Sequence, residues 1–220
     1  FSDIYTVTSK EDRDRLIKRY KKIIKIIKIR PNWVKRVNQE ISEDRNKANI
    51  LSVGRLEYQK NYKELLKEFE NTKDKYKITI IGEGSQKDYL LNLAKNMNVD
   101  LDILQNMGNE NLVQIYKNYK YYISFSLFEG NPKTVLEAMA AGCIPICSNI
   151  PSHSEIVKNN LNGVLFDLNN PNVLNILDNL NNDEVSTDKL KINAIKNVRE
   201  DNSLQLLSTN MYSDYKLITS

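Results

Sequence analysis

The chain of 220 residues is short of the residue types that build several common functional sites. Its single histidine, His153, excludes a metal site made of several histidines. A Ser-His-Asp triad would also have to use this residue, and no Gly-x-Ser-x-Gly motif accompanies it. The two cysteines, Cys143 and Cys147, lie about 13 Å apart if their apolar run is a strand, too far for a disulfide or a shared metal ion. We therefore expect two buried thiols, as in a protein of the reducing cytoplasm.

Long apolar runs and the glycines of a dinucleotide site are missing as well. No stretch of eighteen apolar residues occurs, so no membrane-spanning helix is expected. Gly82-Glu83-Gly84 lacks the third glycine of the dinucleotide fingerprint, which disfavours a nicotinamide cofactor. Asp100-Leu101-Asp102 has a D-x-D pattern that can hold a metal ion, but it precedes a predicted strand and falls at the wrong edge of the sheet. We reject it as a metal site and expect neither a metal nor another cofactor.

Positive charge is concentrated near the N-terminus. Residues 1–47 carry 14 Lys and Arg against 7 Asp and Glu, whereas the rest of the chain carries 18 against 21. The overall charge of +4 therefore does not describe the main part of the chain, and no nucleic-acid partner is expected.

Residues 10–28 predict a basic amphipathic helix. Its apolar face would consist of Leu16, Ile17, Tyr20, Ile23, Ile24 and Ile27. Such a helix can lie on an anionic membrane surface or pack against another part of the protein, and packing is the favoured alternative.

From Asn49 onward, short apolar strands alternate with amphipathic helices. Strands are predicted at 50–54, 77–82, 102–105, 121–126, 143–148 and 163–166, and closing helices at 171–181, 187–198 and 203–218. This alternation predicts an α/β fold, a Rossmann-like parallel sheet between two helical layers.

We expect three parts along the chain. Residues 1–47 would be a basic segment that ends in a linker, 48–200 a Rossmann-like domain, and 201–220 a closing helix. Because the first residue is phenylalanine, we expect a piece of a longer protein.

The stretch FEGNPKTVLEAMAAGCIP (128–145) predicts a turn and a helix start after a buried strand. Asn131 is expected as the N-cap and Pro132 at the first helical position. Free N–H groups and the positive end of the helix dipole would form a phosphate site there. Glu137 would lie about 9 Å along the helix from Asn131, at ~1.5 Å per residue. That distance suits the ribose of a nucleotide whose phosphates lie at the helix start, because a carboxylate can accept hydrogen bonds from both ribose hydroxyls.

Two further groups of charged residues extend this hypothesis. Glu129, at the turn, could bind a sugar hydroxyl or support positive charge at an anomeric carbon. Arg55 and Lys60 follow the first main-domain strand and would stabilise charge on a departing nucleoside diphosphate. For each of these residues, a solvated loop or surface charge remains the alternative. Lys133, in the first turn of the helix, would contact either phosphate or only water.

Taken together, four segments resemble the group 1, family 4 retaining glycosyltransferases. They are GRLEYQK (54–60), IIGEG (80–84), FSLFEGNPKTVLEAMAAGCIPICSN (125–149) and EIVKNNLNGVLF (155–166). Their order and spacing match over about residues 49–180. Those enzymes have the GT-B fold, in which two Rossmann-like domains face each other across a cleft. The chain resembles the C-terminal, donor-binding domain. The resemblance implies that residues 48–200 are the Rossmann-like nucleotide-sugar-binding domain and that residues 1–47 are the remnant of the N-terminal domain with its linker.

The resemblance implies a role for each matching residue. Arg55 and Lys60, beside Gly54, would bind the donor diphosphate, Glu137 the ribose, and Glu129 the transferred sugar. Backbone groups would cradle the phosphates at Gly130, Asn131, Pro132, Lys133 and Thr134. The turn at 106–108, with Met107, would meet the base.

At some positions this sequence departs from the pattern of the family. Asn61 stands where glycine is common, and Asn131-Pro132-Lys133 replaces the more frequent Phe-Gly-x. His153 does not match the catalytic histidine, which belongs to the N-terminal domain of these enzymes.

We therefore predict a retaining glycosyltransferase that moves a sugar from a nucleoside diphosphate, with UDP expected, to a glycan or lipid-linked acceptor. The leaving phosphate would act as the base, without an essential metal. This chain would be the donor-binding half, inactive alone, in the cytoplasm with peripheral contact at the inner face of the cell membrane. The alternatives are a non-catalytic nucleotide-sugar-binding module and a membrane or nucleic-acid adaptor that uses residues 10–36.

Overall fold

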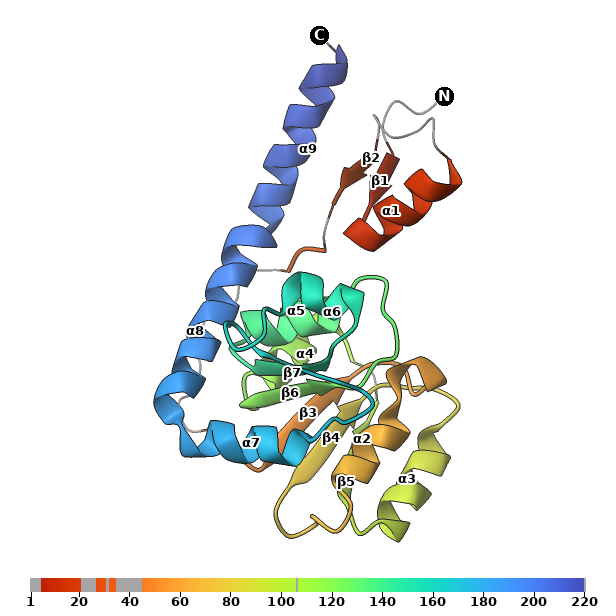
Figure 1. Cartoon of the computed structure of the whole chain (residues 1–220), viewed down its shortest axis with the longest axis vertical. Coiled ribbons are helices and arrows are strands. Elements are labelled where there is room, and N and C mark those ends of the chain that lie inside the picture. Colours follow the sequence, from red (N-terminus) through yellow and green to blue (C-terminus); the bar gives the residue numbers. More distant parts are fainter. Residues whose placement is uncertain (1–4, 21–26, 31, 35–44, 106, 220) are drawn as a thin grey trace.

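The computed structural model describes residues 5–20, 27–30, 32–34, 45–105 and 107–219. Its central feature is a parallel sheet of six strands (Figure 1). In chain order these are β3 (Asn49–Val53), β4 (Lys77–Ile81), β5 (Asp100–Leu104), β6 (Tyr121–Ser124), β7 (Ile144–Ser148) and β8 (Val164–Phe166). The predicted Rossmann-like α/β fold is confirmed.

The order of the strands places the functional edge of the sheet. Across the sheet it runs β5-β4-β3-β6-β7-β8, and every neighbouring pair is parallel. From β3 the chain builds β4 and β5 on one side, then crosses back to build β6, β7 and β8 on the other. The connections after β3 and β6 therefore diverge, and a crevice opens at the carboxyl ends of these two strands.

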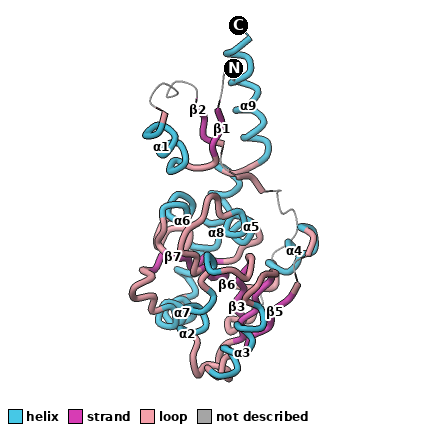
Figure 2. The backbone as a smooth tube through the Cα atoms, turned by 90° about the vertical axis from the view of Figure 1, so that its right-hand side faces the viewer, coloured by secondary structure: helices cyan, strands magenta, loops and turns pink. Residues whose placement is uncertain are grey.

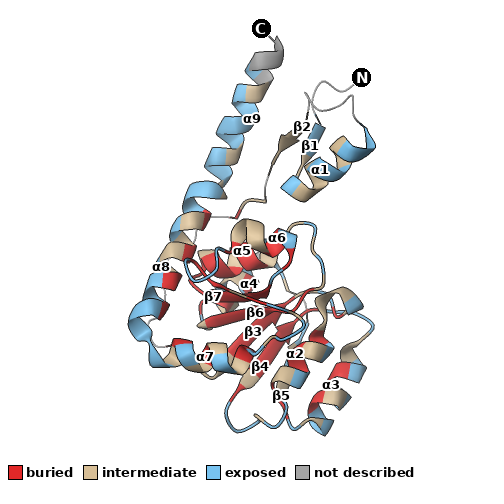
Figure 3. Cartoon of the chain, in the orientation of Figure 1, coloured by how far each residue is buried: buried red, intermediate tan, exposed pale blue. Residues whose placement is uncertain are grey.

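Helices cover both faces of the sheet because its strands are apolar on both faces. In β3, Ile50 belongs to one buried cluster and Leu51 to the other. The first cluster is packed by α2 (Tyr62–Glu68), α3 (Lys87–Asn96) and α7 (Val173–Asn182), and the second by α4 (Asn109–Tyr116), α5 (Lys133–Ala140) and α8 (Glu184–Asp201). Burial of one large aliphatic side chain contributes about 1.5–3 kcal/mol, so these clusters hold the layers together. Figure 3 shows the buried residues on the sheet and on the inward helix faces.

A small unit near the N-terminus lies at one end of the molecule (Figure 2). It consists of the parallel pair β1 (Tyr5–Val7) and β2 (Ile27–Ile29) with α1 (Lys10–Arg19) between them. The last helix, α9 (Leu204–Thr219), reaches this unit, where Asp214 pairs with Arg30 and with Lys28 at 3.3 Å. The two ends of the chain are thus brought together.

The helix expected over residues 10–28 is wrong in its second half. It ends at Arg19, and residues 27–29 form a strand. β-Branched isoleucines favour the extended chain, and pairing with β1 satisfies their backbone groups. Ile23 and Ile24 lie outside the described residues, and Tyr20 is 46% exposed.

The strand expected over 102–105 is also shifted. Strand β5 begins at Asp100, so the Asp100-Leu101-Asp102 pattern lies inside the strand rather than before it. Asp102 pairs with Lys77 at 2.7 Å, at the amino ends of β5 and β4. The pattern still falls at the edge opposite the crevice.

Candidate functional site

Neighbouring backbones approach closely at the carboxyl ends of β3 and β4. A Cβ on Gly82 would lie 1.9 Å from the carbonyl oxygen of Gly54, which only a glycine avoids. A Cβ on Gly54 would lie 2.4 Å from Cε of Lys60, whose side chain passes over the glycine. Gly54 therefore opens the path along which Lys60 reaches the crevice.

The backbone turns at Asn61, directly after Lys60. Asn61 has φ 54° and ψ 37°, in the left-handed region, between η2 (Tyr58–Lys60) and α2. Asparagine tolerates this conformation better than other non-glycine residues. The departure from glycine noted in the sequence is explained, because asparagine can make the same turn.

Lys60 forms an ion pair with Glu129, which lies in the loop after the neighbouring strand β6. The distance from Lys60 Nζ to Glu129 Oε1 is 2.6 Å, and the side chains are only 14% and 10% exposed. Ser126 Oγ donates to the same oxygen at 2.7 Å, and Gln59 Nε2 donates to Oε2 at 3.3 Å. Three donors thus hold one carboxylate in a largely dry position at the switch point.

Arg55 stands on the open side of this cluster. It is exposed, and its guanidinium donates to Gln59 Oε1 at 3.4 Å. Gln59 Nε2 in turn donates to the carbonyl of Phe128 at 2.8 Å. Gln59 therefore connects the loop after β3 to the loop after β6, a role that sequence reasoning missed because glutamine at a turn gives no chemical signal.

The start of α5 differs in detail from the prediction. The helix begins at Lys133, with Pro132 as its N-cap and no side-chain cap, so the assignment of Asn131 as N-cap is wrong. Asn131 Nδ2 instead donates to the carbonyl of Thr8 at 3.2 Å. The tertiary contact draws this side chain away from the helix.

The N-terminus of α5 nevertheless presents free donors. Within the described part of the chain, no backbone acceptor is found for the N–H groups of Gly130, Asn131 and Thr134. Lys133 N donates to the carbonyl of Asn131 at 2.9 Å. Unpaired N–H groups at a helix start, with the positive end of the dipole, suit an anion.

Glu137 projects from the first turns of α5. Its side chain is 12% exposed, and Lys133 Nζ lies 3.4 Å from Oε1. Burial raises the pKa of Glu137, while the Lys133 ammonium and the Tyr116 hydroxyl act in the opposite direction. The carboxylate is thus held close to the edge of the site with few partners of its own.

The remaining residues singled out in the sequence are those of the turn at 106–108 and the two cysteines. Met107 is partly buried against the cluster that includes α4 and α5, and Gly108 is exposed. Asn106 lies outside the described residues. Both cysteines are free and buried, and Cys143 Sγ donates to the carbonyl of Tyr116 at 3.1 Å.

No metal-binding cluster is found in the part of the chain that the structure describes. No group of three or more His, Cys, Asp or Glu side chains there is arranged to hold an ion. None of its helices is both long and apolar enough to cross a membrane.

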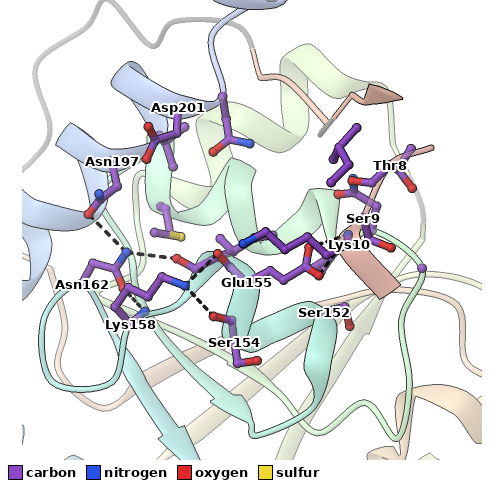
Figure 4. Close-up of a pocket in the computed structure, with 18 residues that line it drawn as sticks. Thr8, Ser9, Lys10, Ser152, Ser154, Glu155, Lys158, Asn162, Asn197 and Asp201 are labelled. Atoms are coloured by element: carbon purple, nitrogen blue, oxygen red, sulfur yellow. Dashed lines mark hydrogen bonds between the residues drawn. The ribbon is translucent and has the colours of Figure 1, made fainter. Parts of the chain in front are cut away.

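A polar cavity of about 460 Å³ lies between the N-terminal unit and α5, α6 (Pro151–Ile156) and α8 (Figure 4). Glu155 on its wall accepts from the backbone N of Lys10 at 3.1 Å, and Asn162 Nδ2 donates to Asn197 Oδ1 at 3.2 Å. The loop at 130–132 borders both this cavity and the start of α5. Sequence reasoning missed the cavity, since its lining comes from segments far apart in the chain.

Comparison with known proteins identifies relatives of this chain. The family described as "Glycosyl transferases group 1" matches residues 34–199. An N-acetylgalactosaminyltransferase of Campylobacter jejuni, which acts on a diphospho-undecaprenol-linked sugar, is 32% identical over 56% of this chain and 34% of its own length. An Escherichia coli UDP-Gal:alpha-D-GlcNAc-diphosphoundecaprenol galactosyltransferase is 30% identical over 60% of this chain and 30% of its own.

Solved structures resemble the fold. HepE of Anabaena, crystallised with UDP and glucose, matches 98% of this chain and 64% of its own with a TM-score of 0.85 at 15% identity. At that identity the likeness concerns the fold alone. The chain spans about a third of the length of the two curated relatives described above.

Proposed function

The chain belongs to the group 1 glycosyl transferases, and from that premise we propose that it forms the donor-binding half of a retaining glycosyltransferase. Its donor would be a nucleoside diphosphate sugar, with UDP as the expected carrier, and its acceptor a glycan or a lipid-linked sugar. The observation that carries the proposal is the Lys60–Glu129 ion pair at the switch point, with Arg55 bonded to the neighbouring Gln59 and with N–H groups at Gly130, Asn131 and Thr134 for which no backbone acceptor is found among the described residues.

The diphosphate would bind between the two loops. Arg55 offers a planar fork to phosphate oxygens, and the N–H groups of Gly130, Asn131 and Thr134 accommodate further charge. Lys60 has three N–H donors, so it can keep Glu129 and also bind a phosphate oxygen. These cations would stabilise the negative charge that grows on the diphosphate as its bond to the anomeric carbon breaks.

The two carboxylates would act on the two sugars of the donor. Glu137 accepts from the ribose hydroxyls, and Glu129 contacts the transferred sugar. The acceptor oxygen would form its bond to the anomeric carbon on the face from which the diphosphate leaves, and a phosphate oxygen would take the acceptor's proton. Met107 and Gly108 would contact the nucleobase of the donor.

The relatives support the choice of donor and acceptor. The E. coli relative is described as using UDP-Gal, and both curated relatives act on diphospho-undecaprenol-linked sugars. Since the match covers only about a third of the length of those relatives, we propose that the acceptor contacts and part of the catalytic machinery belong to sequence outside this chain.

Calorimetric titration with UDP tests the site. Arg55→Ala and Glu137→Ala should each weaken binding about 10- to 100-fold, because each removes hydrogen bonds to a charged group. The matched controls are Arg199→Ala and Glu200→Ala, exposed residues of α8. Unchanged affinity in both site variants would contradict the assignment.

A further inference from the structure

Four polar side chains are buried beneath Glu129, and the proposed mechanism uses none of them. They are Ser124, Ser126, Ser148 and His153, each no more than 5% exposed. They come from β6, the loop after it, β7 and α6, so only the folded sheet brings them together. Buried polar groups are costly unless they are hydrogen-bonded, which makes their connections informative.

These side chains form a row that leads from His153 to the carboxylate. His153 Nε2 lies 3.5 Å from Ser124 Oγ, and Ser124 Oγ lies 3.2 Å from Ser126 Oγ. Ser126 Oγ then donates to Glu129 Oε1 at 2.7 Å. We call His153, Ser124, Ser126 and Glu129 the buried row.

The other ring nitrogen fixes the orientation of the imidazole. His153 Nδ1 lies 2.8 Å from the carbonyl oxygen of Ser148, which can only accept, so Nδ1 carries a proton. Ser148 Oγ donates to the carbonyl of Ser126 at 2.6 Å, which ties the end of β7 to the loop that carries Glu129. With Nδ1 engaged, Nε2 faces Ser124.

The proton count makes the two ends of the row interdependent. Burial lowers the pKa of His153, so the ring is neutral near pH 7 and Nε2 is an acceptor. The row then has three links but only two hydroxyl protons, those of Ser124 and Ser126. One link must therefore lack a proton, and we assign it to the longest separation, the 3.5 Å between Nε2 and Ser124 Oγ. A new donor at Glu129 would free the Ser126 proton and let Ser124 turn towards His153.

We propose that His153 is a positioning residue that, through Ser124 and Ser126, sets the orientation of the Glu129 carboxylate for the transferred sugar. This inference rests on the proposed function, which assigns the sugar to Glu129. A satisfied core histidine, the ordinary alternative, would explain the bond to Ser148 but not a polar row that ends at Glu129. Because coupling is reciprocal, a change at Glu129 must also be felt at His153.

The first test needs no ligand, because His153 is the only histidine in the chain. Its imidazole nitrogen and carbon NMR signals are therefore unambiguous in a labelled sample. Ser126→Ala and Glu129→Gln should each shift the Nε2 signal, whereas Ser208→Ala, on exposed α9, should not. Wild-type signals in both row variants would overturn the proposal.

The second test measures binding of UDP and of UDP-glucose, UDP-galactose and UDP-N-acetylglucosamine. In Ser124→Ala and His153→Leu, the affinity for UDP should stay unchanged. The ratio of the affinity for the best UDP-sugar to that for UDP should fall about fivefold, because weakening one hydrogen bond has an effect of this size. His153→Gln, which restores a polar group towards Ser124, should recover part of the loss.

Ser124→Ala keeps the second test decisive if His153→Leu does not fold. An unchanged sugar-dependent gain in Ser124→Ala would overturn the proposal. Wild-type chain that binds none of the four nucleotides would instead overturn the proposed function, and the NMR comparison would still decide whether the row couples His153 to Glu129.

Discussion

At the scale of single residues, the two site glutamates differ in how the fold surrounds them. Glu129 receives hydrogen bonds from Lys60, Ser126 and Gln59, which fix its position. Glu137 is similarly shielded, but among the described residues Lys133 is the one cation that pairs with it, at 3.4 Å. The first carboxylate is preorganised, whereas the second keeps capacity for a ligand's hydroxyls.

The raised pKa of Glu137 predicts a pH dependence of nucleotide binding. A protonated carboxyl is a poorer acceptor for the ribose hydroxyls, so affinity should fall as pH drops through the raised pKa, where an ordinary glutamate is still ionised. The contribution to folding has the opposite sign. A carboxyl whose folded pKa lies above its unfolded pKa favours the folded state at low pH and loses that benefit as pH rises.

Calorimetric titration of wild type and Glu137→Gln with UDP, from about pH 5 to pH 8, measures this effect. The titration of the UDP phosphate is common to both proteins and cancels in their difference. The two affinity curves should diverge as pH rises through the pKa of Glu137. Curves that stay parallel over the whole range would refute the expectation.

At the scale of elements, α5 is held in place at its C-terminus by Arg45, a residue that precedes β3 in the chain. The guanidinium of Arg45, which is 8% exposed, donates to the carbonyls of Tyr119, Ala141 and Gly142 at 2.6–2.7 Å. These carbonyls include the last acceptors of α5, where positive charge is favourable. Arg45 therefore fixes the helix whose other end faces the site.

Replacing Arg45 should destabilise the chain markedly. Arg45→Ala would leave buried carbonyls without their charged donor, and the free energy of unfolding should fall by about 2–4 kcal/mol. Urea unfolding followed by circular dichroism measures the loss. Arg15→Ala, with a side chain 72% exposed on α1, is the control and should change stability little. Equal stability of the two variants would contradict the anchoring role.

A comparison of the predicted and observed helices and strands shows which sequence patterns are enough to locate an element. The strands of the main sheet could be located to within about two residues, because runs such as those in β6 and β7 are apolar at every position but the last. The extent of α1 could not, since lysines and isoleucines at 25–29 fit a helical face as well as a strand. Pairing with β1 decided between them.

At the scale of the whole molecule, the ends of the chain meet at the N-terminal unit. Asp214 of α9 pairs with Arg30 and Lys28, and Val34 N donates to the carbonyl of Asn202 at 3.1 Å. The main sheet is thus joined to the N-terminal unit by contacts from both ends of the sequence, beside the cavity of Figure 4.

Because the match covers only about a third of the length of the relatives, we expect this chain to bind a UDP-sugar without catalysing its transfer. With a UDP-sugar and no other protein, release of UDP should stay at the rate of the buffer blank, because the proposed function assigns the acceptor contacts to sequence outside the chain. A coupled assay for UDP measures this, with calorimetry as proof that the same sample binds nucleotide. Sustained UDP release that Glu129→Gln abolishes would show that the chain is catalytic alone.

The sequence by itself determined the fold class and the set of candidate residues. Alternating apolar strands and amphipathic helices specify a covered parallel sheet, and its carboxyl edge follows from strand direction, so Arg55, Lys60 and Glu129 could be assigned to one edge in advance. Only the tertiary structure decided that Lys60 pairs with Glu129, that Asn131 turns to Thr8 instead of capping α5, and that His153 lies in a row ending at Glu129. The physical reason is that these contacts join residues far apart in sequence or on different elements, and their distances depend on how the layers pack.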